Sequence, residues 1–283
     1  MLAGGIEEGD IARQIDGPDH VPGVLNQIAI TGFAGFERGI GLFEFSDTAS
    51  KGLRIEERGV RVSVTARINH GRHARYSIYT IVQSGSMRVM IFSDIHNDLA
   101  ALRRLVAIEA DYYVAAGDLV SWGKGLDRCG EMLKERAGKV WVMPGNHESA
   151  EQITSFCAKY GLRDFHGELI EADGRQFGGL GYSSPTPFKT PGEYSEAEIK
   201  QRLLKFAGVE GLVMICHAPP EGTELDRIRV GVHAGSRSVR EFIEANQPDY
   251  FFCGHIHEGE GREIRMGKTV AVNVGKRGYL LEL

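Results

Sequence analysis

The stretch MRVMIFSDIH, residues 87–96, opens the part of the chain that decides the fold. Its apolar run over residues 88–92 predicts a buried strand. Asp94 and His96 come directly after that strand ends. Side chains at positions i and i+2 of an extended segment point to the same side, so this pair can present two ligands to one place. Taken alone, Asp94 could equally cap the next helix, so the weight of the pair depends on the residues at the ends of the other strands.

Strand and helix patterns alternate from residue 87 to the end of the chain. Helices are predicted over residues 99–106, 126–136, 150–160 and 238–245, and from Ser195 to near Gly208. Strands are predicted over residues 88–92, 112–116, 139–143, 212–216, 250–253, 261–266, 269–274 and 279–283, with a type I′ hairpin at Asp173-Gly174. Early βαβ units followed by hairpins indicate an α/β fold, either one mixed sheet or two packed sheets flanked by helices. Ligands of such folds bind beyond the carboxyl ends of the strands.

Residues 1–86 differ in composition from the rest. Residues 1–50 are rich in Gly and acidic residues and have no sustained period, whereas residues 60–68 alternate strictly between apolar and polar. Residues 75–82 could pair with them, but an isolated two-stranded hairpin is marginal in water. We therefore expect residues 1–86 to be an N-terminal extension, poorly ordered or a weak β-hairpin, and residues 87–283 to form the main domain. One hypothesis is that the extension lies upstream of the biological start site, which intact-mass analysis of native protein would decide.

Residues suited to metal binding or acid–base chemistry lie after five strands in turn. They are Asp94 and His96, then Asp118, then Asn146, His147 and Glu148, then His217, and finally His255 and His257. Each has an ordinary structural explanation by itself, such as a helix cap, a turn residue or a buried histidine. Five such coincidences at five consecutive strand ends are improbable, and Gly117, Gly145 and Gly254 permit the sharp turns that would bring the ligands together.

The ordered set D-x-H, G-D, G-N-H-E, H and G-H-x-H resembles the calcineurin-like metallophosphoesterase superfamily. The resemblance covers nearly all of residues 87–283 and is closest to its small phosphodiesterase-type members. It implies a four-layer αββα sandwich with two divalent metal ions. By the family's pattern, the first metal is held by Asp94, His96 and His257, the second by Asn146, His217 and His255, and Asp118 bridges both. His147 is implied as the general acid or the phosphate-contacting histidine.

Ligands of mixed nitrogen and oxygen type suit transition metals more than Ca²⁺ or Mg²⁺. We expect manganese first, with iron, zinc or nickel as alternatives. Two such ions about 3.5–4 Å apart would acidify a bridging water and hold the resulting hydroxide in line with phosphorus. The metals and His147 would offset charge on the oxygens of the phosphoryl group, and a protonated His147 could protonate the leaving oxygen.

One motif departs from the protein phosphatases of the superfamily, which have GDxxDRG. Here the stretch is GDLVSWG, with Ser121 and Trp122 at the places of the second Asp and the Arg. This argues against a protein phosphatase. The closer resemblance to small phosphodiesterase-type members implies instead the hydrolysis of a phosphodiester, such as a cyclic nucleotide or another small phosphoester. Substrate selection is expected in the loops 121–125 and 182–194, where Trp122 could stack on a base or simply pack. His233 and Ser236 could contact substrate, or could belong to a loop before a capped helix.

The whole-chain properties exclude several partners. A net charge of −5 and a pI near 6.1 argue against a long nucleic acid, and no apolar run approaches the roughly 18–20 residues that span a bilayer. The four cysteines are scattered, so we expect small buried residues in a reducing cytoplasm. The partner is then a small phosphoester, and the oligomeric state is left open. Alternatives are a non-catalytic scaffold, which would typically have lost ligands, and a nuclease, which would need a more basic surface.

Overall fold

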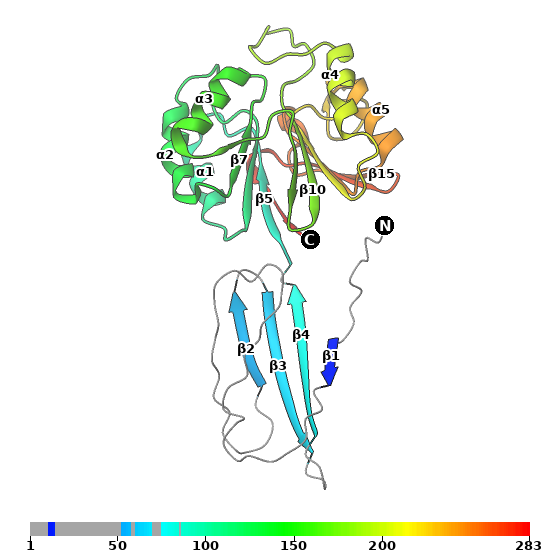
Figure 1. Cartoon of the computed structure of the whole chain (residues 1–283). Helices are drawn as coiled ribbons and strands as arrows, with labels where there is room; N and C mark the ends of the chain where they lie inside the picture. The colour runs from blue at the N-terminus through cyan, green and yellow to red at the C-terminus, as the bar shows by residue number, and fades with distance from the viewer. Residues whose placement is uncertain (1–10, 15–51, 58–59, 70–74, 85) are drawn as a thin grey trace. The chain divides into compact units, whose positions relative to one another are not determined.

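The computed structural model describes residues 11–14, 52–57, 60–69, 75–84 and 86–283. The chain divides into two compact units, Met1–Ser86 and Met87–Leu283 (Figure 1). Each unit is described by itself below.

The first unit contains a four-stranded antiparallel sheet in the order β1-β4-β3-β2. Its strands are β1 (Ile11–Gln14), β2 (Gly52–Glu57), β3 (Val60–Asn69) and β4 (Arg75–Ser84). The strictly alternating pattern predicted β3 and its pairing with β4. It did not indicate β1 and β2, because four and six residues are too few for a period of two to stand out.

The second unit contains two large mixed sheets (Figure 1). The first has the order β17-β5-β6-β7-β8, with only β17 antiparallel to its neighbour. The second has the order β15-β16-β14-β11-β10-β9, with antiparallel strands at both edges. The first sheet comprises β5 (Arg88–Phe92), β6 (Tyr112–Ala116), β7 (Val140–Met143), β8 (Arg163–Asp164) and β17 (Tyr279–Glu282). The second comprises β9 (Leu169–Ala172), β10 (Arg175–Leu180), β11 (Leu212–Cys216), β14 (Tyr250–Cys253), β15 (Glu263–Met266) and β16 (Thr269–Asn273).

Five helices begin at the caps that the sequence indicated or within one or two residues of them. They are α1 (Leu99–Val106), α2 (Leu126–Leu133), α3 (Ala150–Tyr160), α4 (Glu196–Leu203) and α5 (Arg237–Asn246). Asp98 caps α1, and full capping boxes open α3 and α4. The helices predicted over residues 126–136 and from Ser195 to near Gly208 end early, because the 3-10 turns η2 (Lys134–Arg136) and η3 (Leu204–Phe206) replace their last turns. The sequence did not indicate the hairpin β12 (Arg227–Arg229) and β13 (Val232–His233), or the 3-10 turns η4 (His257–Gly259) and η5 (Gly275–Arg277).

Alternation of side chains along the strands sorts the second unit into layers. On β5, Met90 and Phe92 pack with helices α1 to α3, whereas Val89 and Ile91 face the other sheet. The second sheet divides in the same way, since Phe252 of β14 packs between the sheets and Phe251 packs with α4 and α5. Helices therefore cover the outer face of each sheet, and the two inner faces form a core between them. This confirms the predicted αββα sandwich (Figure 1).

The four cysteines are buried and unpaired in this unit. Along the residues that the structure describes, none of the helices has the length and apolar character needed to cross a membrane.

Trp141 is among the largest buried side chains, and it belongs to the core between the sheets. Its side chain is 2% exposed, and its ring lies 5.4 Å from that of Phe165 and 5.3 Å from that of Phe177. Replacing Trp141 by Ala should lower the free energy of unfolding by about 3–5 kcal/mol, because it leaves a cavity that rigid sheets cannot close. Urea denaturation followed by circular dichroism measures this. Leu204→Ala, at a side chain that is 67% exposed, is the control and should change stability by less than about 0.5 kcal/mol. Equal effects of the two changes would contradict this description of the core.

Candidate metal centre

The predicted metal ligands and His147 all lie just beyond the carboxyl ends of parallel strands. Asp94 and His96 follow β5, Asp118 follows β6, and Asn146 and His147 follow β7 in the first sheet; His217 follows β11, and His255 and His257 follow β14 in the second. The two sheets pack face to face with these ends at the same side of the unit. Loops from both sheets therefore meet there.

The loops reach this place through an unusual backbone. Asp94, His96, Asp118 and His255 all have positive φ, between 44° and 68°. Asp and His adopt this left-handed region more readily than most residues, yet it costs of the order of 1–2 kcal/mol each. Gly117 makes the sharp turn expected of it, with φ 100°. Gly145 and Gly254 have a different role from the one predicted, since a Cβ at either position would collide with the carboxylate of Asp118 or Asp94.

One group of candidate ligands is Asp94, His96 and His257. The Nε2 atoms of His96 and His257 lie 3.1 Å apart, and Asp94 Oδ1 lies 3.5 Å from Nε2 of His257. His257 is the most open member, with 57% of its side chain exposed. Asp94 is buried and accepts hydrogen bonds from Ser93 Oγ at 2.6 Å and from the backbone N–H of His255 at 3.0 Å. The group is held by backbone contacts and faces solvent on one side.

A second group comprises Asp118, His217 and His255, with Asn146 among them. Asn146 Oδ1 lies 2.8 Å from His255 Nδ1 and 3.2 Å from His217 Nε2. Asp118 Oδ2 lies 3.4 Å from His217 Nε2 and 3.6 Å from His96 Nε2, so this carboxylate lies between the two groups. Asp118, Asn146 and His217 are nearly fully buried.

The chemistry of these atoms fits bound cations. His217 Nδ1 lies 2.9 Å from the carbonyl of Ala116, so this nitrogen donates and Nε2 presents its lone pair. That lone pair faces Asn146 Oδ1 and Asp118 Oδ2, which are also acceptors. Buried acceptors at such distances repel one another unless a cation or a proton lies between them. Nitrogen and oxygen donors in this combination suit a divalent transition metal.

The charges of the centre also favour a bound cation. Burial alone would raise the pKa of Asp118, but the adjacent His217 outweighs it and holds the pKa below its usual value. Burial alone would lower the pKa of His217, yet the carboxylates of Asp118 and Asp94 raise it to about 9. Burial, reinforced by His217, lowers the pKa of His255 to about 4. A proton on His217 thus stands where a cation would otherwise balance the carboxylates.

His147 lies beside the candidate ligands. One of its ring nitrogens is within 4.8 Å of the ligand atoms of His96 and Asp118, and its backbone N–H donates to Asp118 Oδ1 at 2.9 Å. Its Nδ1 accepts a hydrogen bond from the backbone N–H of Trp122 at 3.2 Å. The neutral ring consequently carries its proton on Nε2. Trp122 packs edge-on to this ring, with centroids 5.5 Å apart, and is 51% exposed.

Sequence reasoning noted Glu148 in the G-N-H-E motif but gave it no role. The structure buries its side chain completely, and its carboxylate accepts hydrogen bonds from the backbone N–H groups of Gly145, Asp118 and Val120 at 2.9–3.0 Å. Glu148 therefore ties the loop after β6 to the loop after β7. Its acidic character in the motif was visible in the sequence, but its partners depend on backbone direction.

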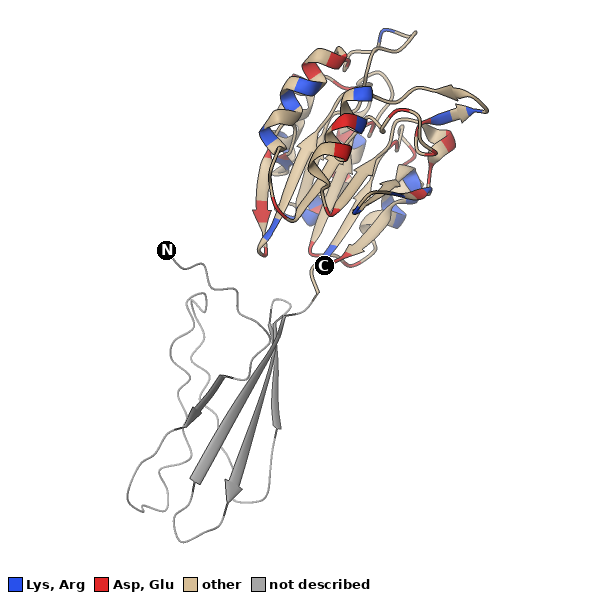
Figure 2. Cartoon of the chain, turned by 90° about the vertical axis from the view of Figure 1, so that its right-hand side faces the viewer, with Lys and Arg blue, Asp and Glu red and all other residues tan. Residues whose placement is uncertain are grey.

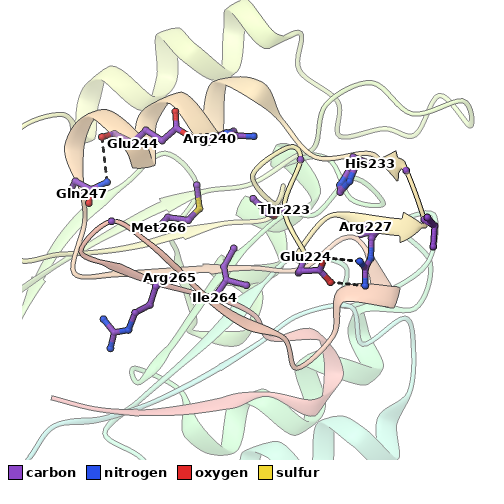
Figure 3. Close-up of a pocket in the computed structure, with 14 residues that line it drawn as sticks. Thr223, Glu224, Arg227, His233, Arg240, Glu244, Gln247, Ile264, Arg265 and Met266 are labelled. Atoms are coloured by element: carbon purple, nitrogen blue, oxygen red, sulfur yellow. Dashed lines mark hydrogen bonds and ion pairs between the residues drawn. The ribbon is translucent and has the colours of Figure 1, made fainter.

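Two other predicted contacts, Ser236 and His233, have structural partners of their own. Ser236 is fully buried, caps α5 through Val239 N–H and donates to Glu196, which is the geometry of the capped-helix alternative. His233 Nδ1 lies 2.7 Å from Asp226 Oδ1, and among the described residues it has no hydrogen bond or ion pair to a candidate metal ligand. His233 lines a hollow of about 680 Å³ between β15, the end of α5 and the β12–β13 hairpin (Figure 3). The arginines Arg227 and Arg240 in this hollow are paired with Glu224 and Glu244.

Comparison with known proteins agrees with the fold and the site. The model of the family of calcineurin-like phosphoesterases matches residues 87–259, more than half of the chain. The chain therefore belongs to the calcineurin-like phosphoesterase family, whose members use divalent metal ions.

Individual relatives extend the match. The uncharacterized protein MJ1162 of Methanocaldococcus jannaschii is 31% identical over 205 residues, which are 69% of this chain and 91% of that protein. One solved structure superposes with a TM-score of 0.58 at 18% identity, covering 70% of this chain and 95% of its own. The protein TT1561 of Thermus thermophilus superposes with a TM-score of 0.54 at 15% identity, covering 70% and 99%. At these identities the solved structures support the fold alone.

Metal loading should release a proton. The pKa of His217 near 9 means that the metal-free chain holds this proton at pH 7.5, and a cation on Nε2 must displace it. The apparent affinity for Mn²⁺ should then rise about tenfold per pH unit between pH 7 and 9 and level off above that. Titration calorimetry in two buffers of different ionisation enthalpy counts the released protons. An affinity independent of pH, with no proton released, would show that His217 is not a ligand.

Proposed function

We propose that this protein hydrolyses phosphodiester bonds of small phosphoesters with the help of two divalent metal ions. The observation that carries the proposal is the convergence of eight side chains from five loops, with nitrogen and oxygen atoms of the kinds that bind metals facing one another at 2.8–3.6 Å. The family membership supports a phosphoesterase. An intact set of ligands also distinguishes the chain from a scaffold that has lost them.

Different residues of the chain would hold the two metal ions. Bound cations would supply Lewis-acid polarisation of the phosphoryl oxygens and an acidified water as the nucleophile. Asp94, His96 and His257 would hold one cation, Asn146, His217 and His255 the other, and Asp118 both. Manganese is the proposed metal, with iron, zinc or nickel as alternatives. The buried backbone contacts to Asp94 and Asp118 keep these ligands oriented before substrate arrives.

His147 would act on the substrate rather than on the metals. Its Nδ1 accepts from Trp122 N–H, so its Nε2–H is available to donate to a phosphoryl or leaving oxygen. A carboxylate beside His147 would favour its imidazolium form. Protein phosphatases of the superfamily have a charged pair in this motif, whereas this sequence has Ser121 and Trp122.

The surroundings favour a small substrate. Figure 2 shows acidic and basic residues interspersed over the visible side of the second unit, and the net charge of the chain is −5. A long polynucleotide would need a continuous basic surface. The half-exposed Trp122 supports a base or aryl group next to the centre, and Phe188 in the loop 182–194 is 73% exposed. The proposed compartment is the cytoplasm, which buried, unpaired cysteines fit.

The decisive experiment compares bis(p-nitrophenyl) phosphate with p-nitrophenyl phosphate. The protein is stripped with a chelator and refilled separately with Mn²⁺, Ni²⁺ or Zn²⁺. The diester should have the higher kcat/KM with at least one metal, and the stripped protein should be inactive. Activity that metal restores on the monoester alone would identify a phosphomonoesterase instead of the proposed phosphodiesterase. Inactivity on both esters with metal bound would support the scaffold alternative.

Two substitutions separate metal binding from hydrogen bonding to the substrate. His147→Ala should keep both metals and lower kcat by about 10²–10³-fold, because a hydrogen-bond donor to the phosphoryl or leaving oxygen is lost. Asp118→Ala should abolish pairing of the metals and activity together. Elemental analysis and steady-state kinetics on the same samples test both. Thr154→Val is the control, since its hydroxyl bonds only Asp164 at an exposed position. Loss of metal from His147→Ala would show that His147 is a ligand.

A further inference from the structure

The loop 182–194 is attached to the candidate metal centre at its base. Tyr182 N–H donates to the carbonyl of Pro144 at 3.2 Å, and Gly192 N–H donates to the carbonyl of Asn146 at 2.9 Å. Gly192 lies so close to Gly145 that a Cβ at this position would collide with its carbonyl oxygen. The loop therefore rests directly on the segment that carries Asn146.

A side-chain contact continues this attachment. Asn146 Nδ2 donates to Thr190 Oγ1 at 3.1 Å, and both side chains are buried. Thr190 Oγ1 in turn donates to Glu193 Oε1 at 2.6 Å, and the backbone N–H of Thr190 donates to the same oxygen at 2.7 Å. Thr186 Oγ1 is a third donor to that oxygen, also at 2.6 Å.

The direction of these bonds is fixed by chemistry. A carboxylate only accepts, so the hydroxyl proton of Thr190 is directed to Glu193. Burial alone would raise the pKa of Glu193, but the bonds from Thr186 and Thr190 outweigh it and hold the pKa below its usual value. The remaining lone pairs of Thr190 Oγ1 can then only accept, and the neighbouring amide must present its NH₂ group to it. Oδ1 of Asn146 is thereby turned to His217 and His255.

We propose that Thr190, oriented by Glu193, is a positioning residue that selects the metal-binding orientation of the Asn146 amide. The inference rests on the proposed function, because it requires Asn146 to be a ligand. The amide oxygen has lone pairs for a cation and the amide nitrogen has none, so a flipped Asn146 cannot coordinate. Partners of this kind typically change metal affinity by about 10–100-fold when they are lost.

The test measures binding of Mn²⁺ alone, by calorimetry and by electron paramagnetic resonance of the coupled pair. Thr190→Val keeps the shape of the side chain but removes the acceptor. It should lower the affinity for one of the two Mn²⁺ ions by about 10–100-fold and leave the affinity for the other within about twofold of wild type, with loss of the coupled signal. Thr190→Ser keeps the hydroxyl and should restore both. Glu193→Ala frees that hydroxyl to donate, so it should also lower the affinity for the same ion.

Thr186→Val is the matched control, because it removes a hydroxyl from the same carboxylate without touching Asn146. It should bind both ions as wild type does. Wild-type binding by Thr190→Val, or equal weakening by Thr186→Val and Thr190→Val, would overturn the inference while leaving the proposed function intact. A wild-type chain that binds no Mn²⁺, Ni²⁺ or Zn²⁺ would overturn both.

Discussion

The centre depends on direct ties between loops that belong to different sheets. The backbone N–H of His255, from the second sheet, donates to Asp94 of the first, and the ring of His217 bonds the carbonyl of Ala116. Each tie satisfies a buried polar group and at the same time fixes the distance across the sandwich. Charged and lone-pair-bearing atoms would otherwise separate to be solvated by water. The fold thus holds the candidate ligands together by its own hydrogen bonds.

The core between the sheets determines the separation that these hydrogen bonds span. Large side chains such as Trp141 and Phe252 hold the inner faces apart by a constant thickness, and the strands end together at one side. Within the first sheet, Glu148 performs a related task by joining the loops after β6 and β7 through backbone N–H groups. The positive φ values at Asp94, Asp118 and His255 are sustained by this surrounding packing.

The sequence predicted most of the strands, most helix caps and the side chains that converge, because all of these depend on local pattern and on the rule for strand ends. It placed Ser121 and Trp122 beside the centre for the same reason. Thr190 lies 44 residues from Asn146, in a proline-rich loop without a period, so no local signal could have found their contact. The same limit explains Ser236, whose partner Glu196 is 40 residues away. His233 and its partner Asp226 are only seven residues apart, but the sequence did not indicate the hairpin that carries His233.

The two halves of the centre differ in their access to water. His257 has 57% of its side chain exposed, whereas His217 is completely enclosed. We expect a cation in the outer half to exchange with solution faster than one in the inner half, since fewer buried contacts must open for it to leave. Purified protein would then readily contain mixed pairs, with the inner position keeping the ion acquired during folding and the outer reflecting the last buffer. Isotope exchange would reveal this as two separate rates, and a single rate for both ions would refute it.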